Sequence, residues 1–179
     1  ANPTITGANA SDFTVSTNIS GTSINGGFYR IFRITFNPSA IGIRTAIINI
    51  VNNDSDENPY TFTIQGTGTN AEIDVLGNGI SITDGSTSAS VSNNTDFGVT
   101  DITSGTITKI FTIKNYGTSP LLISNPTITG AHASEFTISS PPSTLSINPG
   151  GSTNFSVTFD PAAISVRSAV INIANYDAN

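Results

Sequence analysis

The sequence predicts an all-β protein built from β-sandwich modules, and three features support this prediction. Apolar and polar residues alternate along several short segments, as expected for strands with one face in a core. Turn-forming residues separate these segments at spacings of about ten residues, which is typical of a sandwich. No segment of useful length has the periodicity of an amphipathic helix.

The clearest strand signal is in residues 36–68. Apolar residues recur there at every second position and so share one face of each strand: Ala46, Ile48 and Ile50 in the first, and Tyr60, Phe62 and Ile64 in the second. Residues 52–59, NNDSDENP, are turn formers, and Pro59 cannot donate a ladder hydrogen bond. The region therefore predicts a hairpin.

The same pattern returns downstream. Residues 159–179 match 36–56 position by position, and Arg167 lies 123 residues after Arg44. Roughly half of the paired residues are identical, which indicates tandem modules of about 120 residues. We expect the 179 residues to hold about one and a half modules. The sequence contains no Met, which indicates that it is not an intact translation product.

Residues 1–68 are interpreted as the later part of one module whose opening strands are missing. Before the hairpin we expect short strands at Ile5, at 13–15, at Ile24 and at 32–36. We place the module boundary near Thr69 because small residues let the chain leave the last strand there.

Residues 69–179 are interpreted as a second module whose last strand is missing. We expect strands at 73–75, 80–82, 106–115 and 120–124, followed by the repeated half. Residues 83–98 are rich in Ser, Thr, Asn and Gly and predict a surface loop.

The alternation also predicts a core for each module. In the first we expect burial of Phe13, Phe32, Ile34, Phe36, Ile48, Ile50, Phe62 and Ile64. In the second we expect burial of Phe111, Ile113, Phe136, Phe155, Val157, Phe159, Ile171 and Ile173.

Several motifs resemble a known family. They are EIDV at 72–75, TDFG at 95–98, FTIKNYGTSPLLIS, GANASDF, FNPSAIGIRTAIINIVNNDSDENPY and a closing GTG. Together they resemble the choice-of-anchor D repeat of bacterial surface proteins, which is similar in fold to the ASPM, SPD-2 and Hydin (ASH) immunoglobulin-like domains. The second copy departs from the pattern at Ser165, which replaces Gly42, and at Tyr176, which replaces Asn53.

The resemblance implies tandem immunoglobulin-like β-sandwich modules in a long exported array, with an anchor elsewhere in the polypeptide. It implies no catalytic residues, because the shared motifs are strand and turn positions. We therefore expect a protein that is not an enzyme.

Composition narrows the classes of partner. The formal net charge is -6 and the sequence pI is about 4.3, so the surface repels phosphate backbones and a nucleic-acid partner is not expected. Cys is absent, which removes disulfides, thiolate metal sites and Cys nucleophiles. No apolar run reaches membrane-spanning length, so no membrane insertion is expected in this sequence.

Few residues are candidates for chemistry. His132 is the single histidine, and a surface turn is favoured over a ligand or base because zinc sites and relays need more such groups. Asp12 and Glu135 occupy matching places and are interpreted as solvated carboxylates at strand starts. Arg44 and Arg167 also match, and are interpreted as rim arginines that bond loop carbonyls or a carboxylate.

Lys109 and Lys114 are the only lysines. An amide crosslink to Asn115 or Asn172, as some bacterial adhesins form, is an alternative to two ordinary surface lysines. We favour the ordinary lysines, because Lys114 alternates away from Phe111.

The turn at Asp54, Asp56 and Glu57 places three carboxylates within four residues. Calcium prefers such oxygen ligands, so the turn is a candidate calcium site, and calcium is the single cofactor considered. A solvated hairpin turn is the favoured alternative. The matched turn at 175–179 has one acid, so a site in every module is not expected.

Two functions remain open. The first is a non-catalytic structural repeat of a large secreted or cell-surface adhesin, stalk or filament, whose partners are neighbouring modules. The second is a module that binds a glycan or protein of a host or surface through the 83–98 loop. We favour the first, because the sequence has no Trp to form a sugar-stacking platform.

The second module lacks a counterpart of residues 60–68. We expect it to be marginal or unfolded until such a strand is supplied, since burying three large apolar side chains is worth roughly 5 to 9 kcal/mol. The expected supplier is the same polypeptide, with a segment that resembles PYTFTIQGTG. The rarer supplier is a neighbouring chain that donates its strand.

Overall fold

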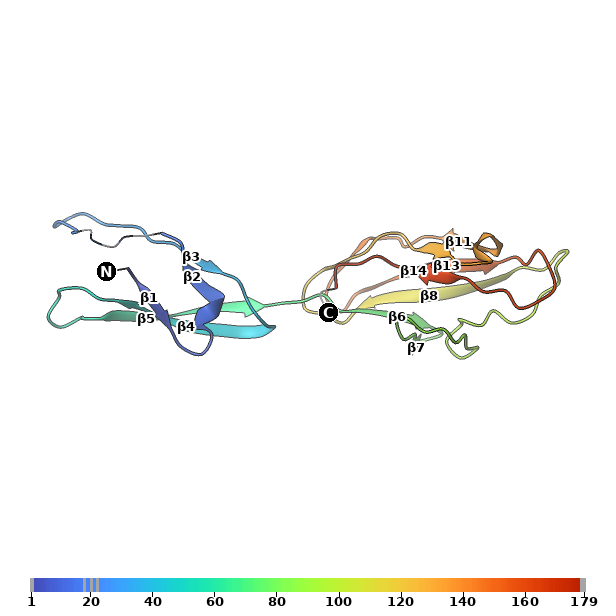
Figure 1. Cartoon of the computed structure of the whole chain (residues 1–179), viewed down its shortest axis with the longest axis horizontal. Coiled ribbons are helices and arrows are strands. Elements are labelled where there is room, and N and C mark those ends of the chain that lie inside the picture. The colour runs from blue at the N-terminus through green and yellow to red at the C-terminus, as the bar shows by residue number, and fades with distance from the viewer. Residues whose placement is uncertain (1, 18, 20, 22, 178–179) are drawn as a thin grey trace. The chain divides into compact units, whose positions relative to one another are not determined.

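The computed structural model describes residues 2–17, 19, 21 and 23–177. Its regular structure is strand apart from two short 3-10 turns. Contacts divide the chain into two compact units, Ala1–Thr69 (unit 1) and Asn70–Asn179 (unit 2), which Figure 1 shows. No helix of the described residues is long and apolar enough to cross a membrane.

Unit 1 contains a three-stranded antiparallel sheet in the order β1 (Thr4–Thr6), β4 (Gly42–Ile50), β5 (Tyr60–Gly68). The predicted hairpin forms β4 and β5. A second layer is the antiparallel pair β2 (Phe13–Val15) and β3 (Ile34–Phe36). The rings of Phe13 and Phe36 lie 4.8 Å apart in this pair.

Burial in unit 1 follows the prediction only in part. Phe13 and Ile48 are buried as predicted, together with Ala46. Phe62 lies directly opposite Ile48, yet it is 37% exposed while Ile48 is 0% exposed. The prediction for Phe62 is wrong because β5 is an edge strand of its sheet, and the short β2–β3 pair is the only second layer among the described residues.

Other positions of unit 1 are half-buried where burial was predicted: Phe32, Ile34, Phe36, Ile50 and Ile64. The strand predicted at Ile24 does not form, and β3 begins at Ile34 rather than Phe32. A strand needs a partner for its backbone groups, and the described residues of unit 1 supply β3 with a partner on one edge only.

Unit 2 contains a five-stranded antiparallel sheet with the strand order β11-β13-β8-β6-β7. The strands are β6 (Ile73–Gly77), β7 (Ile80–Ser81), β8 (Ile107–Asn115), β11 (Phe136–Ser140) and β13 (Ser152–Phe159). The central pair, β8 and β13, places Phe155 opposite Phe111. Alternation along both strands buries one face, as predicted.

Two short pairs complete unit 2. They are β9 (Leu121–Leu122) with β12 (Ser146–Ile147), and β10 (Thr127–Thr129) with β14 (Val170–Asn172). The core consists of Ala71, Phe111, Ile113, Leu121, Ile123, Ile147, Phe155 and Val157. Burial of Phe111, Ile113, Phe155, Val157 and Phe159 confirms the prediction. Phe136, Ile171 and Ile173 are half-buried instead, and they pack against the edge of this core.

Candidate functional site

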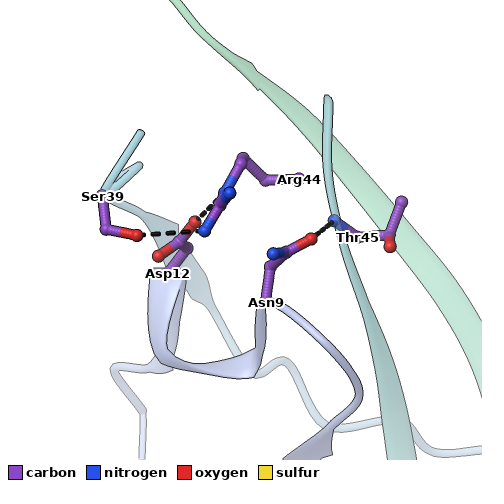
Figure 2. A network of polar contacts seen from close by, with 5 residues as sticks. All are labelled: Asn9, Asp12, Ser39, Arg44 and Thr45. Atoms are coloured by element: carbon purple, nitrogen blue, oxygen red, sulfur yellow. Dashed lines mark hydrogen bonds and ion pairs between the residues drawn. The ribbon is translucent and has the colours of Figure 1, made fainter. Parts of the chain in front are cut away.

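A carboxylate meets an arginine in unit 1, where the 3-10 turn η1 (Ala10–Asp12) leads into β2. The Nε of Arg44, on β4, donates to Oδ2 of Asp12 at 2.5 Å, as Figure 2 shows. A terminal guanidinium nitrogen of Arg44 donates to Oγ of Ser39 at 3.0 Å. The contact therefore ties η1 to a strand of the β1–β4–β5 sheet.

Asp12 is only 2% exposed, so the interpretation of a solvated carboxylate is wrong. The turn η1 directs the side chain onto Arg44 instead of into solvent. Arg44 has one of the roles predicted for it, because it bonds a carboxylate. The hydrogen bond from Arg44, and next that from Ser39, holds the pKa of Asp12 below its ordinary value of 3.8.

We expect this pair to make unit 1 sensitive to acid. A carboxyl group whose pKa is lower in the folded state adds stability above its unfolded pKa, and that stability is lost as the pH falls through the folded pKa. The stability difference between the natural chain and the Asp12→Asn variant should therefore be largest near neutral pH and should shrink below pH 3.8. Thermal unfolding followed by NMR at the buried Ile48 methyl groups measures it. A difference that stays constant down to pH 2, about two units below the ordinary pKa of Asp, would contradict the assignment.

Unit 2 repeats the contact with a longer carboxylate. Glu135 ends the 3-10 turn η2 (Ala133–Glu135), and the Nε of Arg167 lies 3.1 Å from its Oε2. The backbone N–H of Ala162 donates to the same oxygen at 3.2 Å. Glu135 is half-buried, so it too was wrongly interpreted as solvated.

Sequence reasoning missed the role of Asn9. Its Oδ1 accepts a hydrogen bond from the backbone N–H of Thr45 at 2.9 Å (Figure 2). His132 occupies the matching place in unit 2, and its Nδ1 accepts from the N–H of Ser168 at 3.1 Å. The alignment of Asn9 with His132 was the available signal, since both side chains can accept such a bond. The contact gives His132 a structural role.

The acidic turn between β4 and β5 is exposed at Asp54, Asp56 and Glu57. Contacts with Asp56, first its side chain and next its backbone N–H, which donates to Oδ1 of Asp54 at 3.4 Å, lower the pKa of Asp54. The backbone N–H of Asp54 donates to Oδ1 of Asn52 at 2.7 Å, which closes the turn. Among the described residues no group of three or more His, Cys, Asp or Glu side chains is placed to hold a metal ion. The structure therefore does not bring the three carboxylates together.

Two of the residues considered for a crosslink, Lys114 and Asn115, have other contacts. The Nζ of Lys114 lies 4.2 Å from the ring centre of Tyr116. Asn115 is fully buried, and its Nδ2 donates to the carbonyls of Ser119 and Ile147 at 2.8 and 2.9 Å. The amide of Asn115 thus satisfies buried backbone groups, which is an ordinary structural role.

The 83–98 loop has no helix or strand, but its last part is anchored in the core of unit 2. The ring centroid of Phe97 lies 5.5 Å from that of Phe136 and 6.0 Å from that of Phe159. The backbone N–H of Ser90 donates to Oγ1 of Thr95 at 2.7 Å. The longest exposed run of this loop is residues 83–89, so this run is the part most available to a partner.

Among the described residues, each unit also has a strand with an unpaired edge where the matching strand of the other unit is paired on both edges. In unit 2, β14 pairs with β10 alone, whereas the matching β4 of unit 1 lies between β1 and β5. In unit 1, β3 pairs with β2 alone, whereas the matching β13 of unit 2 lies between β11 and β8. Unpaired edges present free backbone donors and acceptors to another strand. They are the candidate interaction sites of this chain.

Comparison with known proteins gives a family match and a match to a solved structure. The family described as HYDIN/CFA65/VesB-like, Ig-like domain matches residues 89–178. No curated protein matches the chain. The chain is similar to a solved structure of a protein of unknown function from Porphyromonas gingivalis W83, with 17% sequence identity and a TM-score of 0.35, over 83% of this chain and 68% of that one.

Proposed function

Because the chain belongs to the HYDIN/CFA65/VesB-like Ig-like domain family, we propose that it is a non-catalytic structural part of a larger protein. Domains of this family are generally non-catalytic. In this proposal, the two units are parts of consecutive Ig-like modules in a tandem array. The array supplies length, because each module contacts only its neighbours.

The recurrence of individual contacts at an interval of 123 residues carries the proposal. Asn49 Nδ2 donates to Thr6 Oγ1 at 3.0 Å, and Asn172 Nδ2 donates to Thr129 Oγ1 at 2.9 Å. The φ angle of Gly7 is 105° and that of Gly130 is 109°. Even Ser165, which replaces Gly42, keeps a positive φ. Contacts that persist where the residues differ, as with Asp12 and Glu135, support one module type used twice.

We place this array on a bacterial cell surface or in a secreted adhesin, stalk or filament. The motifs that resemble the choice-of-anchor D repeat support this setting, as does the low content of charged residues, 10%. The partners are then neighbouring modules of the same polypeptide. Binding of a glycan or protein by the 83–98 loop is the alternative.

The test uses cells that produce the whole protein. An antibody against the exposed residues 84–89 should label intact cells, and labelling only after permeabilisation would contradict a surface location. Inserting three further 123-residue periods should lengthen the surface structure by roughly 100 Å in electron micrographs, because one nine-residue strand is about 30 Å long. An unchanged length would contradict the structural role.

A second variant distinguishes the alternative. Deleting residues 84–89 leaves Phe97 in the core and should not change binding of the cells to glycans or host proteins. Loss of such binding, with the length of the surface structure unchanged, would favour a ligand-binding module.

A further inference from the structure

The open edge of β14 has a counterpart in the same chain that is covered. β4 of unit 1 pairs over its whole length, Gly42–Ile50, with β5. The matching stretch of unit 2 is 165–173. There β14 pairs with β10 on one side, and no strand of the described residues pairs with the other side.

The covering strand decides how much of this sequence becomes a strand. β4 has nine residues, while β14 has three, although the two sequences match. Residues 166–169 are not part of a strand, and Val166 is 88% exposed. β4 is longer than β14 because it has β5 as a partner, and a strand extends only where its backbone groups are paired with those of a neighbouring strand.

Side chains on the inner face of this stretch are also less buried than their counterparts in unit 1. Ile48 and Ala46 are buried in unit 1, whereas Ile171 and Ala169 are half-buried in unit 2. In unit 1 the residues opposite Ile48 and Ala46 are Phe62 and Ile64 of β5. A strand with the same pattern would cover Ile171 and Ala169 in the same way.

The edge also lacks the features that usually protect one. Exposed edges are commonly guarded by Lys, by Pro or by inward-pointing charges, and residues 165–173 contain neither Lys nor Pro. The one charged side chain, Arg167, is held by Glu135. An unguarded edge of this length fits a site that is normally occupied.

Two glycines define the shape of the occupant. A Cβ atom on Gly66 of β5 would lie 2.5 Å from the ring of Phe36, and one on Gly68 would lie 2.0 Å from the carbonyl oxygen of Ala40. Phe159 is the counterpart of Phe36 in unit 2. The strand that covers β14 therefore needs Gly opposite Arg167, where Gly66 faces Arg44 in unit 1.

We propose that the open edge of β14 binds an extended, uncharged segment of the β5 type, antiparallel and in the register of β4 with β5. Tyr60–Gly68, YTFTIQGTG, is the pattern that such a segment follows. The site deepens the proposed function, since a strand from the next part of an array would complete unit 2. Strand binding at β14 does not depend on a surface location of the protein. The experiments on strand binding and on surface location can therefore fail separately.

The test adds the synthetic peptide YTFTIQGTG to the full chain and follows amide hydrogen exchange by NMR. Exchange at residues 166–173 should slow by roughly tenfold or more, because an unpaired edge exchanges far faster than a paired ladder. A matched peptide with Gly66→Val should give no slowing, because its side chain would meet the ring of Phe159.

A linked version removes the dependence on peptide affinity. In this variant the segment 55–68 is repeated directly after Asp177, so that the strand is present at high effective concentration. Absence of slowed exchange at 166–173 in this variant would overturn the proposal. Equal slowing of exchange by the Gly66→Val form would also overturn it. Slow exchange in the natural chain, together with dimers in sedimentation, would overturn it as well, because the edge would then be bound by a second copy of the chain.

Discussion

Replacing Phe155 by Ala should lower the free energy of unfolding of unit 2 by about 3 to 5 kcal/mol, the usual cost of removing a buried aromatic ring. Phe155 is 1% exposed and stacks on Phe111 with ring centroids 5.4 Å apart. It lies on β13, between β11 and β8, where neighbouring strands cannot easily collapse into the space.

The matched control is Asn154→Ala on the same strand. Asn154 is exposed, so the change should cost less than about 0.5 kcal/mol. Denaturant unfolding of both variants gives the comparison. A loss below about 1 kcal/mol for Phe155→Ala in a well-folded unit would contradict its place in the core.

Arg167→Leu should destabilise unit 2 by about 1.5 to 3 kcal/mol, because it leaves the carboxylate of Glu135 without its charged partner. The guanidinium and the carboxylate side chains are 15% and 10% exposed, so water replaces the lost contact only in part. Thermal or denaturant unfolding of unit 2 measures the loss.

The double variant Glu135→Leu with Arg167→Leu is the control for this pair. It should lose less than the sum of the two single variants, since removing both partners leaves no unpaired charge. Strictly additive losses would show that the two residues act independently and would contradict the contact.

Alternation in the sequence predicted the long strands and part of the core. It succeeded for β4, β5, β8 and β13, where each strand has a partner along its length. It failed for Ile24, because a local pattern cannot tell whether a partner strand lies nearby. Phe62 was wrongly placed because the pattern cannot tell whether a second layer covers an edge strand such as β5.

The polar contacts were harder to predict. Asp12 and Arg44 lie 32 residues apart in the sequence, and only the fold of η1 against β4 makes them neighbours. Asn9 and the buried Asn115 bond backbone groups, a role that leaves no charge pattern. The internal sequence match was the useful signal. Arg44 is accompanied by Asp12 and Asn9, and Arg167 is accompanied at the matching positions by Glu135 and His132.

The structure changes the expectation for the strand predicted to complete unit 2. Residues of β8, β9, β12 and β13 form a core without the additional strand. That strand would therefore mainly bury Ile171 and Ala169, at the edge of the core. Marginal stability of unit 2 remains a prediction. The position and register of the covering strand are now specific enough to test.

The most direct measurement is a disulfide crosslink, because the natural chain contains no Cys. In the variant with segment 55–68 repeated after Asp177, Ala169→Cys is combined with Cys at the repeated Ile64 position, since Ala46 faces Ile64 in unit 1. Mild oxidation should link this pair. Cys at the repeated Thr63 position should not link, because a shift of one residue turns the side chain to the other face. Linking at Thr63 and not at Ile64, or at neither, would contradict a β5-type strand bound to β14 in the register of β4.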